Sequence, residues 1–386
     1  MMPETKKSAL NRLRRIEGQV RGIARMVEDE RYCIDVITQV QAVRAALGRI
    51  EQEVLKDHVA TCVEHAIQSG NAEDIAAAIR PVSETLVSAT PFIFVGLGLA
   101  VAFHAGLINL GADGQFLMGG LGAAITVTLV AGQLPPLLTL VVALLGGTVA
   151  GAAYAFVPGF LKARTGAHEV ITTLMLNGVA PSLAFLIVRS IDLSGPPPAI
   201  PAVPRVIDLA TIRVDYGFFV AVAMAAVVSL LLFRTTRGFE LRATGFSRTV
   251  ARGAGMRPGR TTMLAMSLSG GLVGMGSAFF GLGPAGGFSG GPQNDLGYVA
   301  LALTLLAGLR PSGVVVAAVF YGALTTGAKS MVIVAGIPLA LLVVIVAFAI
   351  MFVAAPDLTR SIWRIRAPGA AGAVLSRGGG ADSRPR

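Results

Sequence analysis

The sequence predicts an all-α protein in two parts: a small soluble three-helix domain, then a polytopic membrane helical bundle of about 8–9 spans. Hydrophobic residues make up 54% of the 386 residues and charged residues only 14%, with a mean hydropathy of +0.70. This balance is typical of membrane proteins. Residues 1–85 differ, because they hold 12 Lys/Arg and 13 Asp/Glu. Their composition is that of a soluble domain.

These differences divide the chain into a soluble helical domain (1–80), a transmembrane domain (81–368) and a tail (369–386). The tail is rich in Gly, Ala, Ser and Arg and is expected to be disordered. The net charge of +10 belongs to the hydrophobic part, where basic residues in short connections mark the cytoplasmic side. The high pI is therefore no argument for nucleic-acid binding. The charged N-terminus predicts that no signal peptide is present.

The soluble part is expected to form three helices. Over 10–27, apolar residues recur at three- and four-residue steps, which indicates one buried helical face. A second helix is expected over 32–68, and a stripe of that length needs another copy of the chain to cover it. A short third helix is expected over 72–79.

The soluble part also contains a candidate metal site. His58 and Cys62 lie four residues apart, so they project from one helical face. Cys33 lies 25 residues earlier, roughly 37 Å along a helix at 1.5 Å per residue, so a shared site needs Cys33 from a second, antiparallel chain. Two thiolates and one imidazole suit Cu(I) or Zn(II), and the lack of a fourth ligand favours Cu(I). The alternative is that these side chains only pack.

Three motifs in residues 5–79 are specific: NRLRRIEGQVRG over 11–22, YCIDV over 32–36 and HVATC over 58–62. They resemble the CsoR/RcnR family of metal-responsive repressors. The resemblance implies a dimer of dimers that binds Cu(I) and then releases operator DNA. It further implies metal ligation by Cys33, His58 and Cys62, a place beside the ligands for Tyr32, and DNA contact by Arg12, Arg15 and Arg49.

The remainder of the chain holds nine apolar runs that span or nearly span a bilayer. They fall near 86–106, 113–131, 135–157, 169–189, 216–234, 261–281, 296–309, 312–330 and 333–354. The chain is therefore expected to be a multi-pass protein of the cell (inner) membrane. The segment 191–215 is expected to be an external connection.

The connection 235–260 carries six arginines against one acid, Glu240, so we expect it to be cytoplasmic. On its own it could be a simple membrane anchor. With GADGQ over 111–115, KARTGAHEVITT over 162–173, GFELRATG over 238–245 and ARGAGM over 251–256, it resembles the permeases of ABC importers for simple sugars and nucleosides (branched-chain type). That resemblance covers residues 84–368.

The permease resemblance implies several partners: a separate ATPase subunit, a second permease subunit or a second copy, and an extracytoplasmic substrate-binding lipoprotein. The coupling to the ATPase is implied for Gly238, Glu240, Arg242, Gly245, Arg252 and Gly255. The body contains no paired carboxylates or nucleophilic triad, so we expect transport and not catalysis, with no cofactor in this part. Polar groups inside a membrane are costly, and three of them are candidates for the substrate path: Gln115, Asn177 and Asn294.

Counting spans outward from a cytoplasmic 235–260 places Lys162 and Arg164 inside and the residues before 86 outside. This order separates the repressor-like domain from DNA. The permeases that the chain resembles usually begin with an additional hydrophobic helix before the segment matching 86–106, so the resemblance implies a repressor joined to a permease that lacks its first span. A re-entrant segment 113–131 would instead keep that domain cytoplasmic. The competing function is a Cu(I)-sensing repressor with the permease as a fused passenger.

Overall fold

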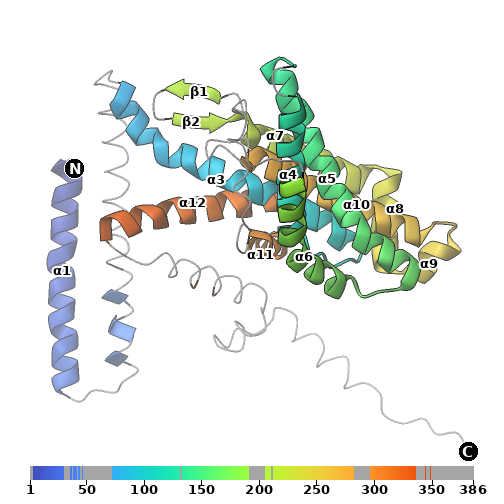
Figure 1. Ribbon diagram of the computed structural model, residues 1–386. Coiled ribbons are helices and arrows are strands. Elements are labelled where there is room, and N and C mark those ends of the chain that lie inside the picture. Colours follow the sequence, from blue (N-terminus) through green and yellow to red (C-terminus); the bar gives the residue numbers. More distant parts are fainter. Residues whose placement is uncertain are drawn as a thin grey trace, which may run out of the picture. The chain divides into compact units, whose positions relative to one another are not determined.

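The structure of the chain is a computed structural model (Figure 1). The described residues are 3–29, 72–130, 133–190, 205–209, 212–281 and 296–335, with isolated positions between 35 and 46 and at 344 and 348. The chain divides into two compact units, Met1–Pro81 with Asp208–Ile212, and Val82–Ile207 with Arg213–Arg386.

The first unit contains helix α1 (Pro3–Glu28), which covers the helix predicted over 10–27. Its buried contact is Ile16 against Val43, with Ile23 and Ala46 packed around them. The predicted helix over 32–68 lies mostly outside the described residues.

Helix α3 (Ala72–His104) is continuous, whereas we predicted a short helix over 72–79 and a separate span over 86–106. The difference has a local cause. Residues 75–79 are Ile-Ala-Ala-Ala-Ile, which favours helix, and the interior Pro81 leaves the helix unbroken.

Seven helices of the described residues are long and apolar enough to cross a membrane. They are Arg80–His104 in α3, α4 (Ala112–Val130), α5 (Pro136–Thr165), α6 (Glu169–Ser190), α7 (Tyr216–Arg234), α10 (Pro258–Gly281) and Pro311–Lys329 in α12 (Pro311–Ala335). They confirm the membrane-helical class. Helix α5 runs beyond the predicted end at 157 and stops at Gly166, which has a positive φ of 74° and whose amide donates to the Lys162 carbonyl oxygen, as at a helix C-cap.

Two predicted segments differ from full spans. Helix α11 (Leu296–Leu306) has 11 residues, about half of the ~20 that a bilayer requires. The segment 333–354 lies almost entirely outside the described residues. Strands β1 (Arg205–Leu209) and β2 (Ile212–Asp215) form a two-stranded sheet in the connection 191–215, where sequence periodicity gave no sign of strands.

Close backbone contact holds α4, α5 and α10 together. A Cβ atom on Gly151 of α5 would lie 2.9 Å from the Cα atom of Gly274 in α10, and one on Gly274 would overlap the Gly147 carbonyl oxygen. Small residues allow this approach where lipid supplies no hydrophobic driving force. Helix α5 packs most extensively against α10 and next against α4.

The order of contacts gives the direction of each helix. Gly147 lies beside Ala278 and Gly159 lies beside Met266, so α5 and α10 are antiparallel. Similarly, Gly114 lies beside Tyr154 and Gly122 beside Ala150, so α4 and α5 are antiparallel. Helix α4 therefore runs parallel to α10.

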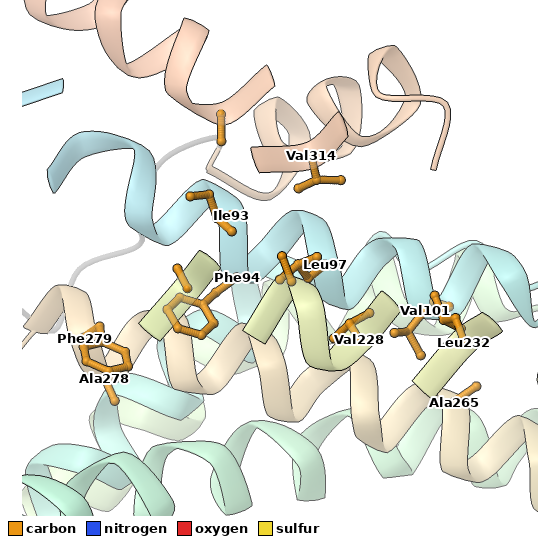
Figure 2. Packing of buried hydrophobic residues seen from close by; sticks show 14 of the residues in the cluster. Ile93, Phe94, Leu97, Val101, Val228, Leu232, Ala265, Ala278, Phe279 and Val314 are labelled. Atoms are coloured by element: carbon orange, nitrogen blue, oxygen red, sulfur yellow. The ribbon is translucent and has the colours of Figure 1, made fainter. Parts of the chain in front are cut away.

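Helix α3 is the most buried of the spans, and Figure 2 shows its apolar residues against α7, α10 and α12. The ring of Phe94 stacks on Phe279, with centroids 5.3 Å apart. Thr90 lies near Gly217, and the His104 ring lies 5.6 Å from that of Phe233. Helices α3 and α7 therefore run in the same direction.

Two short helices, α8 (Thr236–Phe246) and α9 (Arg248–Gly253), follow α7. Helix α8 packs on the end of α7 and on α10, and a Cβ atom on Gly245 would overlap the His104 carbonyl oxygen. We call this end of the second unit the α8 end. The last residues of α3, α5 and α7 and the first residue of α10 lie there, and Val82 lies at the opposite end.

The glycine contact between α5 and α10 yields a prediction. Gly274→Ala forces two backbones apart, so we expect a loss of about 1–3 kcal/mol and a midpoint of thermal unfolding in detergent several degrees lower. Gly271→Ala on the same helix is the control, because its Cβ atom would meet only ordinary contacts, the nearest being Thr148 Cγ2 at 3.4 Å. Equal midpoints for the two variants would contradict the packing.

Candidate functional site

The second unit contains a non-helical segment inside the bundle, between the end of α3 at His104 and the start of α4 at Ala112. Gly106 lies against Gly245 at the α8 end. Three residues later, the Asn109 side chain donates to the Ser269 hydroxyl at 3.0 Å. Ser269 is eleven residues along α10 from Pro258, or roughly 16 Å at 1.5 Å per residue. The chain therefore turns back from the α8 end toward the middle of the bundle.

The buried amides of Asn109 and Gln115 form a reciprocal pair. Asn109 Nδ2 donates to Gln115 Oε1 at 2.9 Å, and Gln115 Nε2 donates to Asn109 Oδ1 at 3.0 Å. Asn109 Oδ1 also accepts from the Gly111 amide at 3.0 Å. With the bond to Ser269, Asn109 uses both of its amide hydrogens and both acceptor positions of its oxygen.

Helix α6 satisfies the backbone of the same segment. The Leu110 amide donates to the buried Thr173 hydroxyl at 3.2 Å, and Asn177 Nδ2 donates to the Leu110 carbonyl oxygen at 2.7 Å. Asn177 Oδ1 accepts from the Gly114 amide at 2.9 Å. Non-helical backbone at membrane depth needs such partners, because lipid offers none.

A carboxylate joins this segment to a second helix start. Asp113 Oδ1, in the first turn of α4, accepts from the Gly297 amide in the first turn of α11 at 2.6 Å. A carboxylate at a helix N-terminus is favourable because the free amides there carry partial positive charge. We call residues 107–115 with Thr173, Asn177, Ser269 and Gly297 the polar core.

The polar core contains two of the three residues predicted for the substrate path. Gln115 and Asn177 both lie in it, bonded to protein atoms, while Asn294 lies outside the described residues. Sequence reasoning missed Asn109, Thr173 and Ser269. The available signal was Asn109 itself, a polar amide between Gly106 and Gly111, five residues after the end of an apolar helix.

The connection 235–260 forms a second site at the α8 end. The Thr235 hydroxyl donates to the Leu231 carbonyl oxygen at 2.6 Å and accepts from the Gly238 amide at 3.1 Å. It thereby caps α8 and ties it to α7. A Cβ atom on Gly238 would overlap the carbonyl oxygens of Leu231 and Leu232, so the first turn of α8 lies directly on the end of α7.

The other predicted coupling residues lie along α8 and α9. Glu240 accepts from Arg237 at 3.4 Å, and the Arg242 guanidinium lies over the Phe233 ring at 5.3 Å, a favourable cation–π geometry. Arg252 is exposed in the last turn of α9, and Gly255 follows with a positive φ of 79°.

The surface of α8 and α9 carries unburied apolar residues. Phe246 is 93% exposed, and Val250 and Phe239 are also exposed. They lie among the arginines of a polar connection, beyond the span of α7. An apolar surface in such a place is typical of a protein–protein contact.

The predicted metal site lies outside the described residues, as do Tyr32 and Arg49. Arg12 and Arg15 lie on α1, and both are exposed. They line a cavity of ≈ 370 Å³ together with Ile16, Gln19 and Ala46.

Comparison with known families gives two matches that adjoin along the chain. Residues 82–355 match the family described as "Branched-chain amino acid transport system / permease component". Residues 5–85 match the family described as "Metal-sensitive transcriptional repressor".

Individual relatives follow the same division. The chain is 35% identical over 289 residues to the guanosine ABC transporter permease protein NupP of Bacillus subtilis, covering 71% of this chain and 80% of the relative. It is 31% identical over 292 residues to the nucleoside ABC transporter permease protein NupB of Lactococcus lactis, covering 71% and 79%. It is 54% identical over 63 residues to the copper-sensing transcriptional repressor CsoR of B. subtilis, covering 16% and 62%. No solved structure matches the chain.

The amide pair of the polar core yields a prediction. Asn109→Leu leaves the buried Gln115 amide without this partner, so we expect a loss of about 1–3 kcal/mol. Asn109→Leu with Gln115→Leu should lose less than the sum of the single variants, with a coupling of about 0.5–3 kcal/mol. Thermal unfolding in detergent measures these differences. Thr128→Val, at an exposed hydroxyl on α4, is the control, and strictly additive losses would refute the pairing.

Proposed function

We propose, from the premise that this chain belongs to the family of branched-chain-type ABC transport permeases over residues 82–355, that it carries nucleosides or simple sugars across the cell membrane. The chain is a multi-pass protein of the inner membrane, and permeases of this family are transport components and not enzymes. The observation that carries the proposal is the polar core, which holds the non-helical segment between α3 and α4 inside the bundle.

Nucleosides are the favoured substrate class. Two permeases with at least 31% identity to this chain are named for guanosine or nucleosides, and a third at 31%, from Haloferax volcanii, is named for glucose. Amide and hydroxyl groups bind the hydroxyl-rich ribose and the base edges of a nucleoside by hydrogen bonds. Gln115, Asn177 and Asn294 are the proposed path residues, with substrate exchanging for internal partners at the first two.

The connection 235–260 is the proposed contact with the ATPase. The exposed Phe239, Phe246 and Val250 supply apolar area, and Arg252 supplies charge at its rim, a common composition for a protein interface. The other proposed coupling residues are Gly238, Glu240, Arg242 and Gly245 in α8 and Gly255 just after α9.

Backbone packing links the proposed ATPase contact on α8 to the polar core. Gly245 of α8 lies against the backbone of 104–106, and Asn109 follows three residues later. Movement of α8 on ATP binding would therefore displace the segment that Asn109, Thr173 and Asn177 hold in place. Such a shift of a packed element fits alternating access between two stable arrangements.

The remaining partners follow from the permease class. A second permease subunit, or a second copy of this chain, would complete the path, and an extracytoplasmic binding lipoprotein would deliver substrate.

Residues 1–80 form a CsoR-like domain, and we propose that Cys33, His58 and Cys62 bind Cu(I) there. Thiolate and imidazole are ligands that suit this soft ion. Relatives of this segment are named copper-sensing. The domain would self-associate as a dimer or tetramer, with Tyr32 beside the ligands. Arg12, Arg15 and Arg49 would contact operator DNA wherever the domain meets it.

The direction of α3 bears on whether the CsoR-like domain can meet DNA. Helices α3 and α7 run in the same direction and both end at the α8 end, so Val82 lies on the side opposite the ATPase contact. Helix α4 runs parallel to α10 and does not reverse this order. This direction supports a position of Val82 outside, and the family match over most of the chain favours the permease function over that of a DNA-binding repressor.

The transport proposal is tested by uptake of labelled guanosine and glucose into cells that express the chain with its ATPase and binding lipoprotein. We expect guanosine uptake that unlabelled nucleosides inhibit. Phe246→Asp should lower it at least about tenfold by weakening ATPase docking, whereas the matched Phe246→Leu should retain it, at equal membrane levels. Absence of uptake for both solutes would overturn the proposal.

The metal proposal is tested on the full chain by anaerobic competition with a chromophoric Cu(I) chelator. Cys62→Ser should weaken Cu(I) binding by more than about a hundredfold. Loss of a residue that only hydrogen-bonds to a metal ligand weakens metal binding by up to about a hundredfold, so a greater loss is expected for a ligand. His65→Ala, at a histidine outside the proposed ligand set, should leave binding unchanged. Unchanged affinity in Cys62→Ser would rule out this site.

A further inference from the structure

A cavity of ≈ 730 Å³ lies where the end of α7 and the start of α8 meet the first turns of α10. Figure 1 shows α8 and α9 at one end of the second unit. The cavity has two chemically distinct parts. Arginines and one glutamate line its rim, and leucines from α7 and α10 line its floor.

The rim carries excess positive charge. Arg237 is paired with Glu240 at 3.4 Å, whereas Arg257 and Arg260 are exposed and make no hydrogen bond or ion pair with another described side chain. Three arginines against one carboxylate attract an anion.

The floor lies at membrane depth. Leu264 and Leu268 are six and ten residues along α10 from Pro258, so Leu268 lies roughly 15 Å from the start of that helix at 1.5 Å per residue. Leu231 faces them from the last turn of α7. At this depth the acyl chain of a lipid can reach the leucines, whereas the surface of a soluble protein cannot.

We propose that this cavity binds an anionic phospholipid of the cytoplasmic leaflet, with its phosphate at Arg257 and Arg260 and an acyl chain along the three leucines. Basic pockets on the cytoplasmic side of membrane helices suit anionic head groups. The bound lipid would fill the space beside α8. The assignment to the cytoplasmic leaflet rests on the proposed ATPase contact, but binding of the lipid does not depend on transport.

The charge and the depth together favour a lipid over a soluble anion, because inorganic phosphate gains nothing from the leucines. An acidic surface of the ATPase is the other candidate for the arginines. It would occupy the rim alone and leave the floor open.

The test is native mass spectrometry of the purified full-length chain, titrated with phosphatidylglycerol or with phosphatidylcholine of the same acyl chains. We expect tighter binding of phosphatidylglycerol. Arg257→Gln with Arg260→Gln should weaken it by about fivefold per arginine, the ratio equivalent to about 1 kcal/mol for each basic residue near an anionic surface. Arg164→Gln, in the last turn of α5 at the same end, is the matched control and should have no effect.

Three outcomes would overturn the lipid site: equal binding of the two lipids, phosphatidylglycerol binding that survives the double variant, or competition by glycerol phosphate as strong as by the lipid. If the double variant kept lipid binding but lost association with the ATPase, the arginines would belong to that interface and the proposal would fail. Guanosine uptake is measured separately. Failure of the transport proposal would therefore appear in the uptake assay, and failure of the lipid site would appear in the mass spectra.

Discussion

The constraint on which the rest of the structure depends is the absence of water from the bilayer, which obliges every backbone polar group to find a partner within the protein. Most of the second unit meets it with helices. The segment between α3 and α4 does not, and α6 and α10 compensate with Thr173, Asn177 and, through Asn109, Ser269. These bonds join residues up to 160 positions apart, so the segment fixes the relative placement of four helices.

The same segment connects the α8 end to the middle of the bundle. At one end, Gly245 of α8 lies against Gly106, where the absence of side chains gives backbone contact. In the middle of the bundle, Asn109 and Asn177 hold the segment among helices whose glycines also pack backbone to backbone. Rigid contacts of this kind transmit a displacement, because packed interfaces have discrete arrangements.

The sequence predicted the class of fold and most spans, because each apolar run is long enough to show in average hydropathy. It did not predict where α5 ends or how short α11 is, since hydropathy measures composition and not helix length. The polar core was predicted only in part. Gln115 and Asn177 were selected as costly polar groups, but their partner Asn109 was missed, because the pairing of buried amides depends on tertiary contacts that no local pattern records. Their contact with substrate stays a prediction.

The central claim is that α3 and α7 run in the same direction, so that Val82 and Val250 lie on opposite sides of the membrane. Both side chains are exposed. The direct test places a single cysteine at either position in a Cys33→Ser, Cys62→Ser background and treats intact cells with a membrane-impermeant maleimide. The account predicts labelling of Val82→Cys in intact cells and of Val250→Cys only after permeabilisation. Labelling of both positions from the outside, or of Val250→Cys alone, would contradict it.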